Sequence, residues 1–473
     1  MKLYPFQEPI FGRSRDEKVF ALFMETGTGK TIVSIATIIH LYKEKQINFA
    51  IIIAPKMVCE PVWEYELSKF RGDLNYRLFK WIGGVSDTDK YLLKMIIKDI
   101  ANVDVIHSML PILLINVEAF SHPKIYEFIT SILIATKNIV ILDESTHIKN
   151  VKSIRTKGLV KLSPKANYKR ILSGFPVLRS PEDLYTQIQF LGANLIPYAS
   201  YYAFRNDYCN LRAMGRFQIV TGHKNLDRLA GLIKNFSVRV LKKDCLDLPD
   251  KVHTKRYVEM TMEQKRLYDQ MKNEGYAVLK GMEGKPVFAT TFLAQLSKLH
   301  QIANGLLLQQ KLHIESLKYN AMLEMLENEV SNQATIWFWF VETLTRMEGL
   351  VNKKFGPGSC GIIHGEISHA ERLITLGRFQ SGRSRFLLAT PGTLMEGQNL
   401  TCCDYVTYFN NSTHLVHRIQ SEDRFHRIGQ VNKVTYADLV TRGTVEDKIL
   451  DNLQKNHKIG ADILQDQWQQ WFS

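Results

Sequence analysis

The sequence predicts an α/β protein with two parallel β-sheets. Near-continuous apolar runs suit strands that are buried on both faces, and helix-length segments separate these runs. The same pattern occurs in two separate parts of the chain. The runs of the first part cover residues 50–54, 139–142 and 170–172, and those of the second part cover residues 335–340, 361–364, 385–389, 405–409 and 434–439.

The stretch between the two parts, residues 201–317, is richer in charge and in helical periodicity. We expect an N-terminal lobe over residues 1–200, a linker with helical insertions over 201–317, and a C-terminal lobe over 318–473. A chain of 473 residues is long enough for such lobes to bury their own cores.

Composition indicates a folded protein with a polyanionic partner. Hydrophobic residues make up 45% of the chain and charged residues 23%, which excludes long disordered tracts. Lys and Arg number 61 against 47 Asp and Glu, so the net charge is 61 − 47 = +14. Nucleic acid is the first candidate partner.

Hydropathy and cysteine spacing bear on the location of the protein and on metal binding. No apolar stretch approaches the ~18–20 residues that span a bilayer, and no secretory leader is visible, so we expect a cytoplasmic protein without a membrane partner. The six cysteines form no C-x-x-C pair. We therefore expect reduced structural thiols and no structural zinc.

The strongest local motif is a glycine-rich loop between an apolar strand and a helix. In such a loop, backbone N–H groups converge on phosphates, the lysine adds charge, and the hydroxyl after it binds Mg²⁺. Met24 stands where the strict pattern has glycine. The predicted ATP-binding residues of the loop are Thr26, Gly27, Thr28, Gly29, Lys30 and Thr31, with Thr31 also a metal ligand.

A pair of carboxylates follows the apolar run 139–142. Ligands bind at the carboxyl ends of parallel strands, so Asp143 is expected to hold Mg²⁺ and Glu144 to activate the attacking water. The alternative is an acidic helix start after a core strand. The phosphate loop earlier in the chain favours the catalytic interpretation of this acidic pair.

Arg424 and Arg427 lie three residues apart near the end of the chain. On a helix both would reach the same side and could neutralise a γ-phosphate. A solvated charged helix is the alternative.

These motifs resemble the SWI/SNF-like branch of superfamily 2 helicases and translocases, in the family's order and over almost the whole chain. The most specific match is the His-Arg-Ile-Gly-Gln ending at residues 426–430. The other matching stretches are 4–7, 25–31, 51–55 with Trp63, 114–118, 143–150, 172–176, 248–252, 262–268, 293–304 and 390–400.

The resemblance implies two RecA-like lobes that bind ATP and Mg²⁺, with Gln7 reading adenine and His147 coupling the lobes. It also implies DNA contacts by Lys56, Asn116, Lys149 and Thr390. In the stretch 390–400 the spacing is about one residue longer than usual, and Pro391 and Met395 replace small residues. The family's chromatin-reading domains are not visible in the sequence. The chain therefore resembles the minimal form of the motor found in phages and bacteria.

The predicted function is an ATP-dependent DNA helicase or translocase acting on duplex or branched DNA, such as forks and recombination intermediates, independently of sequence. RNA helicase activity is one alternative, and a switch that binds ATP but hydrolyses it poorly is another. Two further features have less specific interpretations. The four rings at residues 337–340 are expected in the core, and the alternative is that they stack bases as in single-strand binders. The basic run 149–170 is either a DNA contact or a solvated face.

Overall fold

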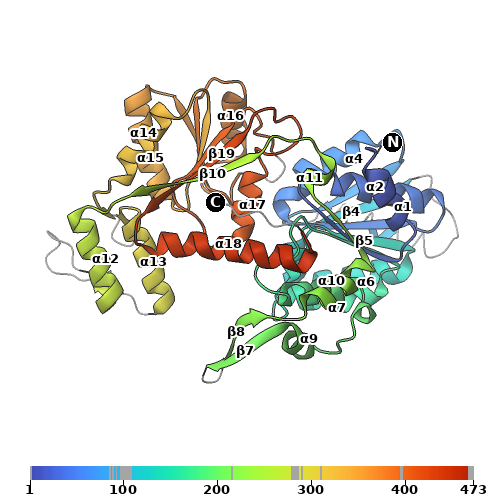
Figure 1. Cartoon of the computed structure of the whole chain (residues 1–473). Helices are drawn as coiled ribbons and strands as arrows, with labels where there is room; N and C mark the ends of the chain where they lie inside the picture. Colours follow the sequence, from blue (N-terminus) through green and yellow to red (C-terminus); the bar gives the residue numbers. More distant parts are fainter. Residues whose placement is uncertain are drawn as a thin grey trace. The chain divides into compact units, whose positions relative to one another are not determined.

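The computed structural model describes residues 3–84, 87, 90–91, 93–95, 109–214, 217–277, 287–288, 291–308, 312–394 and 398–466. These residues form two compact units (Figure 1). Unit 1 contains the described residues up to 247 together with 456–466, and unit 2 contains the described residues of 248–455. Residues 201–317, expected as a linker, are distributed over both units.

Unit 1 is built on a parallel sheet that has, among the described residues, seven strands in the order β3-β4-β2-β5-β6-β1-β9. The strands are β1 (Val19–Met24), β2 (Phe49–Ala54), β3 (Tyr76–Trp81), β4 (Leu110–Asn116), β5 (Asn138–Leu142), β6 (Tyr168–Leu172) and β9 (Ser237–Val240). The helices are α1 (Gln7–Ser14), α2 (Lys30–Lys43), α3 (Lys56–Val58), α4 (Tyr65–Lys69), α6 (Pro123–Ala135), α7 (Ile154–Leu162), α8 (Glu182–Leu191), α9 (Tyr201–Tyr208), α10 (Leu226–Lys234) and α11 (Lys242–Cys245). An antiparallel hairpin joins β7 (Cys209–Met214) to β8 (Phe217–His223).

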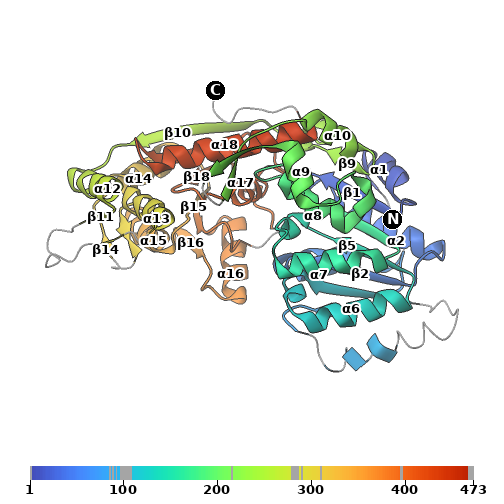
Figure 2. The same ribbon diagram turned by 90° about the horizontal axis from the view of Figure 1, so that it is seen from below.

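Two cores cover the two faces of this sheet, because successive side chains of a strand point to opposite faces. In β2, Ile51 and Ile53 pack into the core that includes α6, α7 and α8, whereas Ile52 packs into the core that includes α2. The helices α6 and α7 can be followed in Figure 2. Strands covered on both sides need apolar residues at every position, which explains the continuous runs in the sequence.

Unit 2 is built on a second parallel sheet, with the order β10-β19-β18-β15-β17-β16 among its described strands. These are β10 (Lys251–Val258), β15 (Ala334–Trp337), β16 (Cys360–Ile363), β17 (Phe386–Ala389), β18 (Tyr405–Tyr408) and β19 (Val434–Thr441). The helices are α12 (Met262–Glu274), α13 (Phe292–Ala303), α14 (Lys318–Asn328), α15 (Val341–Phe355), α16 (His369–Gln380), α17 (Leu415–Glu422) and α18 (Val445–Leu464), whose residues from 456 onward are grouped with unit 1. Two short antiparallel pairs join β11 (Tyr276–Ala277) to β12 (Val287–Phe288) and β13 (Leu306–Leu307) to β14 (Leu312–His313).

The two helix-covered parallel sheets confirm the predicted α/β class with two RecA-like lobes. One detail of the prediction is wrong. The strand expected over 335–340 ends at Trp337, and the chain then leaves the sheet. Phe338 and Phe340 are buried, but the Trp339 side chain is 37% exposed, so only three of the four rings belong to the core. No helix among the described residues combines the length and apolar character needed to cross a membrane.

Candidate nucleotide site

The phosphate loop of unit 1 has the strand, loop and helix that the sequence predicts. It follows β1, and α2 begins at Lys30. Gly27 and Gly29 have φ values of 89° and 90°, a left-handed conformation that glycine adopts without strain. The buried Lys30 ammonium donates to the carbonyl oxygen of Met24 over 3.0 Å. Lys30 therefore lies across the loop, and Thr31 follows it at the helix start.

Gln7, the predicted adenine-reading residue, is attached to this loop. It begins α1 and is 1% exposed. Its Nε2 donates to the carbonyl oxygen of Thr28 over 3.0 Å, and its Oε1 accepts from the backbone N–H of Tyr4 over 3.1 Å. A Cβ atom on Gly29 would overlap the Gln7 amide. Only glycine at position 29 thus allows Gln7 to approach the loop this closely.

Asp143 and Glu144 follow β5, as expected. The buried Asp143 carboxylate accepts two hydrogen bonds, from the Trp63 indole N–H over 2.8 Å and from the Glu144 backbone N–H over 2.9 Å. Burial raises the pKa of Asp143, while the positive charge of Lys30 and the Trp63 hydrogen bond act in the opposite direction. The predicted carboxylate therefore lies within electrostatic reach of the predicted phosphate-binding lysine.

The loop after β6 contacts the phosphate loop. A Cβ atom on Gly174 would lie 3.2 Å from Thr26 Oγ1 and 3.6 Å from Lys30 Nζ, so the two loops are closely packed. A side chain at position 174 would therefore crowd Thr26, and glycine accommodates its close approach.

Arg239, on β9, links strand β1 to the loop after β6. Its Nη1 donates to the carbonyl oxygens of Phe23, over 3.2 Å, and Gly174, over 2.9 Å. Its Nε and Nη2 contact the carboxylate of Asp466, with a shortest distance of 2.7 Å. Sequence reasoning missed Arg239 and Asp466, because neither belongs to a recognisable motif and they are 227 residues apart.

Two of the predicted DNA contacts in unit 1 lie near each other. Asn116, at the end of β4, accepts a hydrogen bond from the backbone N–H of Gly83 over 3.2 Å. A Cβ atom on Gly83 would lie 3.5 Å from the exposed Lys56 ammonium.

Lys149, another predicted DNA contact, lies far from this pair in the sequence. It is partly buried, and burial lowers its pKa. Burial also lowers the pKa of His147.

Arg424 and Arg427 belong to unit 2, and the expectation that a helix carries both is wrong. Helix α17 ends at Glu422, and the arginines follow in turns. Arg424 is 5% exposed, and Arg427 Nη1 donates to the carbonyl oxygen of Gln398 over 3.4 Å. Glu422, the last residue of α17, forms ion pairs with Arg418 and Lys251.

Thr390, the predicted DNA contact of unit 2, follows β17. Its hydroxyl lies 2.6 Å from that of Thr393, and its backbone N–H donates to the carbonyl oxygen of Ile363. Within the stretch 390–400, residues 395–397 lie outside the described part of the chain, and with them the substitution at Met395.

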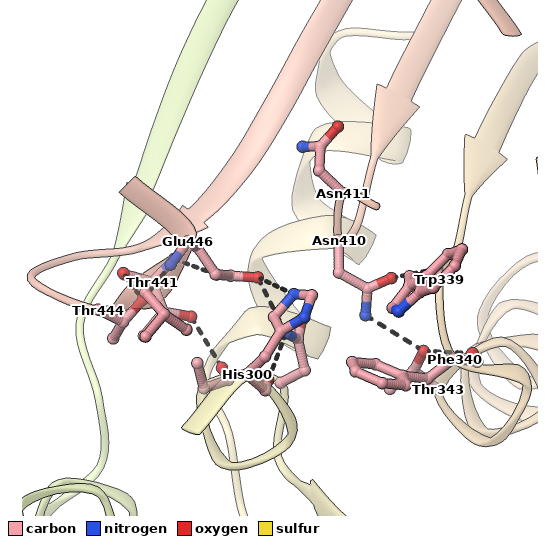
Figure 3. A network of polar contacts seen from close by, with 12 residues as sticks. His300, Trp339, Phe340, Thr343, Asn410, Asn411, Thr441, Thr444 and Glu446 are labelled. Carbon is pink, nitrogen blue, oxygen red and sulfur yellow. Dashed lines mark hydrogen bonds and ion pairs between the residues drawn. The ribbon is translucent and has the colours of Figure 1, made fainter. Parts of the chain in front are cut away.

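A buried ionic cluster in unit 2 was not predicted. The Lys318 ammonium contacts Glu446 Oε1 over 2.7 Å and Oε2 over 2.8 Å, and Asn304 Oδ1 over 2.9 Å. Glu446 also accepts from the backbone N–H of Thr441 over 2.8 Å, and His300 Nε2 lies 3.7 Å from Glu446 Oε1 (Figure 3). The cluster ties α13, α14 and α18 together.

The residues of unit 1 suit a magnesium nucleotide. Gly27 and Gly29 open the loop, Lys30 carries positive charge, and the Thr31 hydroxyl and Asp143 carboxylate are oxygen ligands of the kind Mg²⁺ takes. No group of three or more His, Cys, Asp or Glu residues suited to a metal occurs among the described residues. Mg²⁺ typically needs only one or two carboxylates besides the phosphates of its nucleotide.

A parallel sheet with a glycine-rich loop after one strand and an acidic pair after another is the arrangement of phosphate-loop nucleotide-binding lobes. Residues 14–307 match the SNF2-related domain, and residues 317–429 match the helicase conserved C-terminal domain. The chain belongs to the SNF2-related family of helicases and translocases.

Curated relatives are identical to the chain at about a quarter of the aligned positions. "Putative ATP-dependent helicase/translocase YwqA" of Bacillus subtilis (strain 168) is 26% identical over 456 residues, covering 93% of this chain and 46% of the relative. "DNA annealing helicase and endonuclease ZRANB3" of Mus musculus is 24% identical over 472 residues, covering 98% of this chain and 41% of the relative. The chain thus spans less than half the length of both relatives.

Among solved structures, the chain is similar to "Sulfolobus solfataricus SWI2/SNF2 ATPase core in complex with dsDNA". The sequence identity is 22% and the TM-score 0.43, with 98% of this chain and 93% of that chain covered.

Proposed function

We propose that the protein hydrolyses ATP at the unit 1 site. Lys30 holds the β- and γ-phosphates, Thr31 and Asp143 hold Mg²⁺, and Glu144 orients and deprotonates the attacking water. Mg²⁺ neutralises charge on the phosphates when it is bound. The observation that carries this proposal is the convergence of the phosphate loop, Asp143 and Lys30 in one unit.

Two further roles belong to the proposal. Gln7 favours adenine, because its amide can both donate and accept while it touches the loop. Arg424 and Arg427 of unit 2 neutralise the γ-phosphate in the transition state, a role that another domain can supply. As a division by motif order we keep an N-terminal lobe over 1–200, a linker with helical insertions over 201–317 and a C-terminal lobe over 318–473, whereas the compact units divide after residue 247.

We propose that the polyanion is DNA and that ATP hydrolysis drives translocation on it. Support comes from the net charge of +14, from the approach of Lys56 and Asn116 to one loop, and from the family. Lys149 and Thr390 are the other proposed contacts. Phosphate contacts carry no sequence information, so binding is independent of sequence.

The rate of phosphate release from ATP tests this function, with the nucleic acids compared at equal concentrations of nucleotide residues. Four parallel reactions are compared: one without nucleic acid, one with linear duplex DNA, one with forked DNA and one with RNA. Lys30→Ala is the inactive control. We expect strong stimulation by DNA and little by RNA. Stimulation by RNA alone would establish an RNA helicase instead. Nucleotide binding without stimulated release would establish a switch.

The finer proposal is a role on branched DNA, such as replication forks and recombination intermediates undergoing branch migration. A fork presents two arms and therefore more phosphates to a basic surface than one linear path does. Greater stimulation by forks than by linear duplex is expected. Equal stimulation would leave a general duplex translocase.

A further inference from the structure

An aromatic cluster lies at the carboxyl edge of the unit 2 sheet. Trp339 follows β15 by two residues, and its backbone N–H donates to Asn410 Oδ1 beyond the end of β18 (Figure 3). Asn410 Nδ2 lies 3.5 Å from the Thr343 hydroxyl, at the start of α15. These bonds hold the tryptophan backbone in place outside the sheet.

The Trp339 side chain packs against two histidines. Its ring centroid lies 6.3 Å from that of His414, at an interplanar angle of 24°, and 5.6 Å from that of His417, at 36°. The two imidazoles are stacked on each other at 5.3 Å. The three ring planes lie within 36° of one another, yet Trp339 remains 37% exposed. Trp337, by comparison, is completely buried.

Polar groups suited to a DNA backbone lie along the same edge. β15 pairs in parallel with β17 and β18, so the carboxyl ends of all three strands meet there. The Thr390 and Thr393 hydroxyls follow β17. Arg372 donates to the carbonyl oxygens of Gly365, beyond the end of β16, and Thr393. A cation and two hydroxyls thus lie beyond the strand ends next to β15.

We propose that Trp339, with His414 and His417, stacks an unpaired base of a DNA strand that runs along this edge. The inference rests on the proposed function and deepens it, since it names unpaired DNA as part of the substrate. A flat apolar surface offers little to a phosphate but accepts the face of any base. A base inside a duplex has both faces covered, so the occupant is a base released from pairing.

His417 extends the apolar surface near neutral pH. Burial lowers the pKa of His417, with His414 acting in the same direction, so its imidazole is uncharged at pH 7. The Ser412 hydroxyl lies 3.0 Å from His417 Nδ1 and fixes the ring orientation. The neutral His417 ring offers contact to a base without attracting phosphates.

Tryptophan fluorescence and binding titrations test the proposal on the full chain. The ligands are oligo(dT), and a duplex closed at both ends by hairpins, at matched nucleotide concentration. The variants are Trp339→Ala and Trp339→Phe, and the control is Tyr257→Ala, which removes an exposed ring from β10 of the same unit. We expect oligo(dT) to quench the wild type, and Trp339→Phe to lose that quenching. Trp339→Ala should bind oligo(dT) about tenfold more weakly or worse, with Trp339→Phe in between and Tyr257→Ala unchanged.

Three outcomes would overturn the inference. The first is unchanged oligo(dT) affinity and quenching in both Trp339 variants with unchanged thermal unfolding. The second is an equal loss of affinity for oligo(dT) and closed duplex. The third is a Trp339-dependent signal with ATP alone and none with DNA, which would assign the ring to a contact formed with nucleotide. Failure of the proposed function itself is distinguishable, because the wild type would then bind neither DNA.

Discussion

The indole Nε1 of Trp63 donates a hydrogen bond of 2.8 Å to Oδ2 of Asp143, although the two residues are 80 positions apart. Both side chains are buried. Trp63 lies nine residues after the end of β2 and Asp143 directly after β5, and these two strands are paired neighbours in the sheet. A donor to a carboxylate holds it in its ionised form and fixes its direction. Trp63 is therefore a positioning residue for the proposed metal ligand.

Replacement of Trp63 by Phe keeps a ring but removes the donor. We expect Trp63→Phe to need more Mg²⁺ for half-maximal ATP hydrolysis and to lose roughly 10- to 100-fold in activity at limiting Mg²⁺, as with other residues that orient metal ligands. Titration of phosphate release with Mg²⁺ measures this. Trp337→Phe is the matched control, because it changes a buried tryptophan in unit 2. The same Mg²⁺ dependence in both variants would contradict the role of Trp63.

Gln7→Ala should affect ATP in two ways. Loss of the bond to Thr28 frees the phosphate loop, so KM for ATP should rise, and loss of the amide should reduce selectivity for ATP over GTP. Steady-state hydrolysis of both nucleotides separates the effects. A higher KM with unchanged selectivity would mean that Gln7 only supports the loop.

Lys318→Met should destabilise the protein strongly. It leaves the Glu446 carboxylate buried without its cation, and breaking a buried pair in this way costs about 3–5 kcal/mol. Denaturant unfolding of the full chain measures the free energy change. Arg442→Met removes one partner of the exposed pair with Glu259 and should cost less than about 1 kcal/mol. Equal effects would show that the buried cluster does not stabilise the fold.

His300 should make stability depend on pH. Burial lowers its pKa to about 4, Lys318 acts in the same direction, and Glu446 opposes them. The unfolded histidine takes up a proton near its ordinary pKa of about 6.5, which the folded one accepts only near 4. The free energy of unfolding should therefore fall as pH falls through this window, by up to about 3 kcal/mol.

Comparison of His300→Gln with the wild type at several pH values tests this. The variant should lose most of the decrease between pH 7 and 4, measured as the free energy of unfolding in denaturant. Equally steep decreases in both proteins would assign the pH dependence to other groups.

The sequence predicts the parts of the fold that depend on local pattern. Continuous apolar runs such as residues 50–54 correctly predict central strands, and the spacing of Gly27, Gly29 and Lys30 predicts the phosphate loop. Periodicity failed at residues 335–340, because apolar character continues after the strand has ended at Trp337. It failed again at Arg424, because α17 ends at Glu422 and the arginines follow in turns.

Contacts between distant residues could not be predicted. The Trp63–Asp143 bond, the Arg239–Asp466 pair and the Lys318–Glu446 pair each depend on tertiary packing of elements far apart in the chain. No local sequence motif marks these pairs, because the two partners of each pair lie in segments far apart in the sequence. The roles of the predicted site residues stay predictions until they are measured.

Triplex displacement most directly tests the central claim, which is that ATP hydrolysis at Lys30, Asp143 and Glu144 drives movement along DNA. The substrate is a linear duplex carrying a labelled third strand, and the comparison is wild type against Glu144→Gln, which should keep ATP binding because Lys30 and Asp143 remain. We predict that the wild type releases the third strand only with ATP, and that Glu144→Gln binds ATP and DNA but releases none. Strand release by Glu144→Gln at the wild-type rate, or none by a wild type that hydrolyses ATP on DNA, would contradict the account.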